Sequence, residues 1–113
     1  MSPSWAATTR LVRDRAGDRC EYCLMHQALQ GGTFHVEHVV PICEGGPDST
    51  DNLSLSCPGC NLVKATRTFA PDPVTGAVLP LFNPRTDSWA EHLDWEGHLL
   101  LGITPKGRGW SRR

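Results

Sequence analysis

The chain has 113 residues, of which 39% are hydrophobic and 20% are charged, and its formal net charge is −1. This length predicts a single small domain over residues 1–113, in a size range where folding often depends on a bound metal or another cross-link. The nearly neutral charge does not predict strong non-specific binding to nucleic acid, and no apolar run is long enough to cross a membrane.

The cysteine content and the start of the chain indicate its compartment. The five cysteines are an odd number, which argues against a framework made only of disulfides. Residues 1–5 lack the basic and apolar parts of a secretory signal. We therefore expect a cytoplasmic protein in a reducing environment. Cys43 has no partner in a CxxC pair, and we interpret it as a small buried hydrophobe or a bystander thiol rather than a ligand or a nucleophile.

The first predicted element is a short helix over residues 8–16. Thr8 or Thr9 can cap its N-terminus, and Gly17 stands where a left-handed residue usually ends a helix. This helix would deliver Cys20 to the core of the domain.

Two short strands and a second helix are predicted next. Residues 34–40 contain β-branched side chains and end at Pro41, which favours a strand that stops there. Gly, Pro, Asp, Ser and Thr crowd residues 44–51 and predict a loop. Residues 53–55 are the second strand, and residues 61–69 are a helix.

The side chains of this second helix suggest two faces. We expect Leu62 and Val63 to point inward. Lys64 and Arg67 are three residues apart, which places them on a common side of a helix.

The last third of the chain carries weaker signals. Residues 77–82 predict a strand that Pro80 confines to the edge of a sheet. The capping-box spacing that starts at Ser88 predicts a short helix. Residues 99–103 predict a last strand, and residues 105–113 are expected to fray.

Two CxxC pairs lie on either side of the predicted strands. A CxxC turn presents two sulfurs to one metal ion, so two turns fill the four tetrahedral positions that zinc prefers. A site without an open position is structural rather than catalytic. The predicted ligands of this structural zinc are Cys20, Cys23, Cys57 and Cys60.

The segment around these cysteines resembles the HNH endonucleases, which are nucleases with a ββα-metal fold. The shared pattern is an acid and a histidine on the first strand, a proline, a Gly-Gly turn, Asn-Leu, and a CxxC followed by Asn and Lys at the start of a helix. In this chain the pattern reads Glu37-His38, Pro41, Gly45-Gly46, Asn52-Leu53, Cys57 to Cys60, Asn61 and Lys64.

The resemblance covers residues 20–67 and implies an α+β fold. The expected architecture is a ββα-metal core over about residues 20–70, stapled by the four-cysteine zinc site. An N-terminal helix precedes this core, and a small C-terminal extension over about residues 71–113 follows it. The implied activity is metal-dependent cleavage of DNA.

The family pattern also implies catalytic roles. His38 would be the general base, and Glu37 and Asn61 would hold a catalytic Mg²⁺ or Mn²⁺ ion. Related proteins more often carry Asp where this chain has Glu37. Asn52 would tie the loop so that His38 keeps its orientation. Two alternatives stay open, because Asn61 can instead cap its helix and Asn52 can be an ordinary turn residue.

Three further side chains are candidate contacts for nucleic acid. His35 lies two residues before Glu37, and hence on the same face of a regular strand, where it could contact phosphate, act as an additional metal ligand or be a solvated histidine. Lys64 and Arg67 could touch phosphate oxygens, or they could be ordinary surface cations.

Two other functions compete with a nuclease. A non-catalytic zinc module that binds DNA or protein would explain the four cysteines, but not the placement of Glu37, His38, Asn52 and Asn61. A thiol redox protein is less consistent with two CxxC pairs at zinc-type spacing. The small domain shows no second recognition module, so sequence selectivity would depend on a partner protein or a homodimer.

Overall fold

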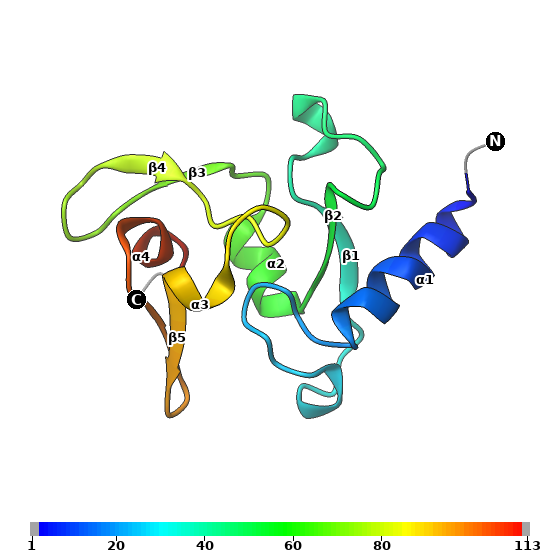
Figure 1. The fold of residues 1–113 in the computed structure, drawn as a ribbon, viewed down its shortest axis with the longest axis horizontal. Coiled ribbons are helices and arrows are strands. Elements are labelled where there is room, and N and C mark those ends of the chain that lie inside the picture. Colours follow the sequence, from blue (N-terminus) through cyan, green and yellow to red (C-terminus); the bar gives the residue numbers. More distant parts are fainter. Residues whose placement is uncertain (1–2, 112–113) are drawn as a thin grey trace. The chain divides into compact units, whose positions relative to one another are not determined.

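A computed structural model describes residues 3–111 of the chain (Figure 1). The chain groups into two compact units, Met1–Ala65 and Thr66–Arg113. Each unit has buried side chains of its own. None of the helices in the described part of the chain combines the length and the apolar character needed to span a membrane.

The first unit begins with α1 (Trp5–Ala16). Ser4 caps this helix, because its hydroxyl oxygen accepts a 3.1 Å hydrogen bond from the Ala7 amide. Gly17 ends the helix with a φ of 62°, which confirms the predicted stop. The predicted start at residue 8 is wrong. The cap lies further upstream, and Thr8 is a buried helical residue that is 5% exposed.

β1 (His35–His38) and β2 (Leu53–Ser56) form a two-stranded antiparallel sheet. Glu37 lies opposite Ser54 in the register of this sheet. Both predicted strands are confirmed, although β1 is shorter than residues 34–40 because the chain turns away after His38. The whole of β2 is buried, and α1 packs against both strands (Figure 1).

The connections of this unit contain two single turns of 3-10 helix, η1 (Gln27–Leu29) and η2 (Ile42–Glu44). The side chains that fill the interior come from α1, from the first CxxC turn and from the sheet. Those with no exposed surface include Val12, Cys20, Tyr22, Phe34, Leu53 and Leu55.

α2 (Pro58–Lys64) completes the ββα arrangement. Cys57 is its N-cap, and the Cys57 sulfur accepts a hydrogen bond of 3.4 Å from the Cys60 amide. The helix ends at Ala65, whose φ of 48° takes the backbone out of the right-handed helical region. The prediction of a helix over residues 61–69 is therefore wrong at both ends.

The buried face of α2 also differs from the prediction. Leu62 is 83% exposed and Val63 is 37% exposed, so neither is a core residue. The side chain that points inward is Lys64, which is 2% exposed. A lysine can be buried in this way when its aliphatic stem packs and its ammonium group finds acceptors.

The second unit contains two further antiparallel pairs and two helices. β3 (Phe69–Pro71) pairs with β4 (Val78–Pro80), and β5 (Leu93–Glu96) pairs with β6 (Leu99–Gly102). α3 (Trp89–His92) leads directly into β5.

Three predictions in this unit are confirmed and two strands are new. β4, α3 and β6 occur at the predicted residues 77–82, Ser88 onward and 99–103. β3 and β5, which pair with the two predicted strands, were not predicted. β3 begins at Phe69, where the sequence predicts the end of a helix.

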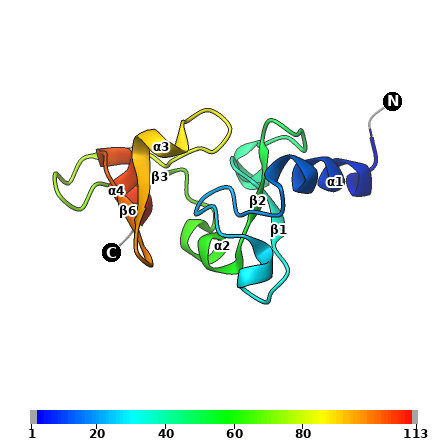
Figure 2. The same cartoon turned by 60° about the horizontal axis from the view of Figure 1, so that its bottom comes forward.

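The prediction that residues 105–113 fray is wrong for the part that the structure describes. α4 (Pro105–Ser111) packs against β6 (Figure 2) and buries Trp110. A Cβ atom at Gly107 would lie 1.9 Å from the His92 carbonyl oxygen, so the helix depends on glycine for this close approach. Residues 112–113 lie outside the described residues.

Arg108 attaches α4 to the loop after β3. Its Nε and Nη2 atoms donate hydrogen bonds of 2.8 Å to the two carboxylate oxygens of Asp72. The same carboxylate accepts a 2.7 Å bond from the Thr75 hydroxyl and a 3.1 Å bond from the Val74 amide. These donors, with the Arg108 guanidinium contributing most, hold the pKa of Asp72 well below its usual range.

Candidate metal centre and active site

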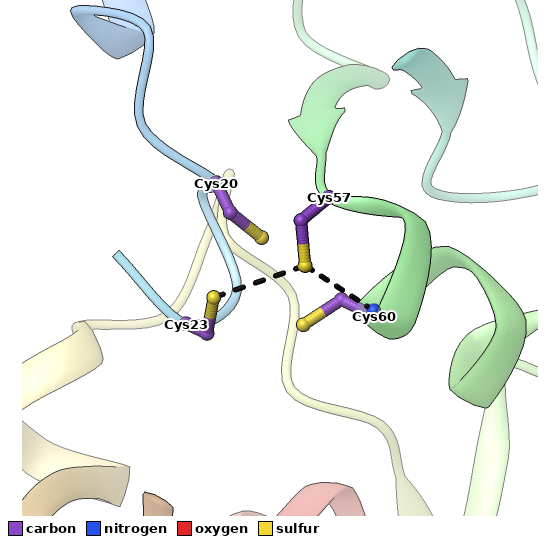
Figure 3. A group of neighbouring side chains, drawn as sticks. All are labelled: Cys20, Cys23, Cys57 and Cys60. Atoms are coloured by element: carbon purple, nitrogen blue, oxygen red, sulfur yellow. Dashed lines mark hydrogen bonds between the residues drawn. The ribbon is translucent and has the colours of Figure 1, made fainter. Parts of the chain in front are cut away.

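Four cysteine sulfurs meet between the turn after α1 and the start of α2. Their side chains point toward one another (Figure 3), and their Sγ atoms all lie within 4.8 Å of one another. The Sγ atoms of Cys23 and Cys57 are 3.9 Å apart. A tetrahedral ion with Zn–S bonds of about 2.3 Å gives sulfur–sulfur edges of about 3.8 Å. Cys20, Cys23, Cys57 and Cys60 are therefore positioned to bind a metal ion, as the sequence predicts.

Local backbone geometry shapes the first CxxC turn. The Leu24 amide donates a 2.7 Å hydrogen bond to the Cys20 carbonyl oxygen, and the Cys20 amide donates a 2.9 Å bond to the Met25 carbonyl oxygen. Leu24 adopts a φ of 68°, which closes the turn and lets both cysteines face the same point. The second pair needs no such turn, because Cys57 caps α2 and Cys60 lies in its first turn.

The thiols perturb one another strongly. Hydrogen bonding with Cys20 is the main cause that lowers the pKa of Cys57. Cys20 is also the main cause that raises the pKa values of Cys23 and Cys60. Four thiolates at this separation would repel one another, so they require a cation between them. The donor set fits a zinc-type ion and leaves no open position for a substrate.

His38 ends β1, and 16% of its side chain is exposed. Its Nε2 atom lies 2.6 Å from Oδ1 of Asp48, a side chain that is 71% exposed. The indole ring of Trp5 stacks on the imidazole, with ring centroids 6.0 Å apart and an interplanar angle of 6°. The imidazole is therefore held at one nitrogen and covered on one face, while part of it is open to solvent.

The Glu37 carboxylate has different partners, inside the unit. The Ser54 hydroxyl lies 3.5 Å from Glu37 Oε1 and donates a 3.1 Å hydrogen bond to the hydroxyl oxygen of Tyr22. Burial raises the pKa of Glu37, while a hydrogen bond from Tyr22 and the charge of Lys64 lower it. Burial and this carboxylate together raise the pKa of Tyr22 well above its usual value.

Asn52 joins the end of β1 to the loop that precedes β2. It is 7% exposed, and its Nδ2 atom donates hydrogen bonds of 3.0 Å to the carbonyl oxygens of Val40 and Pro47. Its Oδ1 atom accepts a 2.9 Å bond from the Val40 amide. A Cβ atom at Gly46 would lie 1.7 Å from the Val40 carbonyl oxygen, so the Gly-Gly turn allows the loop to close onto Asn52.

Two residues of α2 contribute to the site in different ways. Asn61 follows the first turn, and its side-chain amide has no hydrogen-bond partner among residues 3–111. The alternative that Asn61 caps the helix is wrong, because Cys57 is the cap. The Lys64 ammonium group donates hydrogen bonds to the carbonyl oxygens of His38 (3.2 Å) and Ala65 (3.4 Å). Its burial does not fit either the predicted phosphate contact or an ordinary surface cation.

The remaining residues that were predicted to contact nucleic acid lie in different parts of the chain. His35 begins β1 and is exposed. Arg67 belongs to the second unit and lies beyond the end of α2, so it does not share a helical face with Lys64. Cys43 is exposed and lies outside the four-cysteine cluster, which excludes the prediction of a small buried hydrophobe.

Residues 20–67 match the sequence model of the family described as HNH endonuclease. These residues form an HNH domain. They contain β1, β2 and α2 in the expected ββα order, together with all four clustered cysteines, so the α+β prediction with a four-cysteine metal site is confirmed. An HNH domain implies interaction with nucleic acid. No curated protein and no solved structure matches the chain.

Four side chains around this HNH domain were not predicted as site residues: Trp5, Tyr22, Asp48 and Ser54. Strand pairing could have indicated Ser54, because it lies opposite Glu37 in the register. Tyr22 lies inside the first CxxC turn, where only its burial reveals its contact with the carboxylate. Trp5 and Asp48 reach His38 from a helix and a loop that no spacing rule relates to it.

Proposed function

We propose that the chain is a metal-dependent DNA endonuclease that hydrolyses phosphodiester bonds with His38 as the general base. The observation that carries this proposal is the end of β1. There the HNH domain holds a partly exposed imidazole next in sequence to a half-buried carboxylate. A neutral imidazole can take a proton from water near neutral pH, which is the first requirement for attack on phosphorus.

Zinc has a structural role in this proposal. The four-cysteine cluster joins the first CxxC turn to the start of α2, and it offers no free coordination position. A closed zinc site cannot activate water. Its contribution is to fix the helix that carries Asn61 and Lys64 beside the sheet that carries Glu37 and His38.

Glu37 and Asn61 are the residues that would hold the catalytic ion. A half-buried carboxylate whose pKa is raised by desolvation is under-neutralised, and the Asn61 amide oxygen is a hard ligand with no other hydrogen-bond partner among residues 3–111. This oxygen donor pair fits Mg²⁺ or Mn²⁺, which bind few protein groups and keep several waters. When bound, such an ion supplies positive charge that offsets the charge growing on the phosphoryl and leaving oxygens.

Three side chains have the remaining roles in the proposed reaction. His38 accepts the proton of the attacking water. Lys64 holds the carbonyl group of His38 and adds positive charge near Glu37. Asn52 keeps the loop after β1 closed, so that the backbone of His38 stays in place. The expected products are a 5′-phosphate and a 3′-hydroxyl.

The affinity for DNA should be low. Two arginines of α1 are bound to the backbone of their own unit: Arg13 donates a 2.9 Å bond to the Phe34 carbonyl oxygen, and Arg15 donates a 2.7 Å bond to the Leu53 carbonyl oxygen. His35 and Arg67 remain the candidate contacts for phosphate. With few cations in contact with phosphate, binding should be weak even at low salt and should fall only with a shallow salt slope, and a partner protein or a second copy of the chain would add the missing contacts.

A plasmid-nicking assay tests the proposed activity. Zinc-loaded wild-type protein, with supercoiled plasmid at low salt, should convert the plasmid to nicked or linear DNA only when Mg²⁺ or Mn²⁺ is present. His38→Ala should keep its zinc and its circular dichroism spectrum and lower the rate about a hundredfold or more. His98→Ala, which removes an exposed histidine of the second unit, is the matched control and should cleave at the wild-type rate.

The main rival is a zinc module that binds DNA or protein without cleaving it. The nicking assay separates the two functions. Equal rates for wild type and His38→Ala, or no cleavage by wild type with either metal, would refute the nuclease proposal and favour the rival.

A further inference from the structure

The closest polar contact of the His38 ring is Asp48, a residue of the loop between the Gly-Gly turn and β2. The 2.6 Å separation of His38 Nε2 and Asp48 Oδ1 is the distance of a strong, charge-assisted hydrogen bond. Asp48 has no role in the sequence pattern that identifies the HNH domain. Its contact with the ring needs a separate explanation.

The chemistry of the two groups determines where the proton lies. A carboxylate can only accept hydrogen bonds, so a neutral imidazole that bonds to it through Nε2 must carry its proton on Nε2. The other ring nitrogen, Nδ1, then keeps its lone pair. A free imidazole populates both tautomers, and only the form with a bare Nδ1 can accept a proton at that atom.

The loop that carries Asp48 is anchored on both sides of this residue. The Pro47 carbonyl oxygen accepts a 3.0 Å hydrogen bond from Asn52 Nδ2, and the Thr50 carbonyl oxygen accepts a 2.7 Å hydrogen bond from Arg15 Nη1. These two anchors fix the backbone around a carboxylate that is itself 71% exposed. A surface carboxylate without such anchors would lose the contact easily through side-chain entropy.

The His38 ring is restrained in a second direction as well. Trp5 stacks parallel to it and limits rotation about its side-chain bonds. Asp48 and Trp5 thus act on different parts of the imidazole, one on the Nε2 edge and the other on a face.

We infer that Asp48 is a positioning residue for catalysis. It holds His38 in the tautomer with a proton on Nε2, so that Nδ1 is the atom that takes the proton of the attacking water. This inference rests on the proposed function for its catalytic part, while the state of the ring can be measured without any reaction.

The ring is tested first, by ¹⁵N NMR of zinc-loaded, histidine-labelled protein without Mg²⁺, at about pH 8.5, well above the ordinary pKa of imidazole. The His38 signals are those that disappear in His38→Ala. In wild type, the Nε2 shift should be that of a protonated nitrogen and the Nδ1 shift that of a bare one. In Asp48→Ala the two shifts should move toward each other as the second tautomer becomes populated. Unchanged shifts in Asp48→Ala would overturn the inference, whether or not the protein cleaves DNA.

The reaction is tested second, with the plasmid assay under saturating Mg²⁺. Asp48→Ala should lower kcat about ten- to a hundredfold, the usual range for partners that orient a functional group, and leave KM nearly unchanged. Asp48→Glu should restore part of the rate, because it keeps an acceptor on a longer side chain. Asp51→Asn, which removes a charge from the same loop on a residue that bonds Ser49, is the matched control and should behave as wild type.

The NMR and cleavage measurements test different claims, so each claim can be refuted without the other. If the wild-type protein never cleaves DNA, the proposed function is refuted. The NMR comparison would still decide whether Asp48 holds the His38 ring in one tautomer. A variant whose ring changes tautomer but whose kcat equals the wild-type value would overturn the catalytic part of the inference.

Discussion

The ammonium group of Lys64 donates a 3.2 Å hydrogen bond to the carbonyl oxygen of His38. This bond links the last residue of α2 to the last residue of β1, and so connects the helix that carries Cys60 to the proposed general base. The lysine charge also lowers the pKa of Glu37 against the effect of burial. One buried cation therefore serves both members of the Glu-His pair.

Lys64→Met should destabilise the first unit. Methionine preserves most of the apolar stem, but it leaves the carbonyl group of His38 without its donor and Glu37 without its neighbouring charge. We expect a loss of about 1–3 kcal/mol, the usual cost of a buried polar group that loses its partner. Urea denaturation followed by circular dichroism measures this change. Arg10→Met, at an exposed position of α1, is the control, and equal midpoints for the two variants would contradict the prediction.

The features predicted correctly from sequence are those that depend on spacing. Two CxxC pairs indicated the metal cluster, and the resemblance to the HNH endonucleases, which rests on the order of Glu37, His38, Asn52 and Asn61, implied a ββα unit. These patterns can be recognised in a sequence because the spacing within a CxxC turn places its two sulfurs near one point, and because the residue types of short strands indicate an antiparallel pair.

The features that were not predicted depend on tertiary packing. The burial of Lys64 requires the His38 carbonyl oxygen on a distant strand, and helical spacing alone favours an exposed side chain. α4 has two internal glycines and low intrinsic helix propensity. It forms because Gly107 permits close packing and because Arg108 binds Asp72. Neither partner is apparent from the local sequence.

Loss of one zinc ligand should unfold the first unit. We expect about one tightly bound zinc per chain, and Cys57→Ser removes one of its four thiolate ligands while keeping a side chain that can cap α2. The metal-binding free energy in model zinc fingers is about ten or more kcal/mol and acts as folding free energy, so the variant should aggregate or lose its structure. Metal analysis and circular dichroism measure the effect.

Cys43→Ser changes an exposed thiol outside the cluster and should keep both the zinc and the fold. A soluble Cys57→Ser variant with wild-type melting would exclude the structural role of the metal.

The second unit should lose stability in acid through Asp72. Its pKa is lowered in the folded state by Arg108, so its contribution is present above the unfolded pKa of about 4 and is lost as the pH falls toward the lower folded value. Asp72→Asn should therefore lower the melting temperature at pH 7 and flatten its decline below about pH 4. Tryptophan fluorescence reports on this unit, because Trp89, Trp95 and Trp110 lie within it.

The matched control for this acid effect is Asp94→Asn, which changes an exposed carboxylate of β5. It should melt at the wild-type temperature at both ends of the pH range. If the melting temperature of Asp72→Asn still falls below about pH 4 as it does in wild type, another group causes the loss of stability in acid.

Glu37→Gln should separate stability from activity. Burial raises the pKa of Glu37, because it disfavours the charged form of the carboxyl group in the folded protein. The folded protein is therefore more stable while Glu37 is protonated, and this stability is lost as the pH rises through the folded pKa. Without Mg²⁺ at pH 7, the neutral glutamine should raise the melting temperature. In the nicking assay the same change should lower the rate about a hundredfold or more, because it removes the charge that holds the catalytic ion. Higher Mg²⁺, or Mn²⁺, which binds such ligands more tightly, should restore part of the rate.

Two further variants complete the test of Glu37. Glu37→Asp should retain activity if the site tolerates the shorter side chain that related proteins more often carry. Glu44→Gln, at an exposed acid of η2, is the control for charge loss and should leave both melting and cleavage unchanged. If Glu37→Gln cleaves plasmid with the rate and the metal dependence of wild type, the carboxylate does not hold the ion. Any rise in its melting temperature would then reflect only the removal of a half-buried charge.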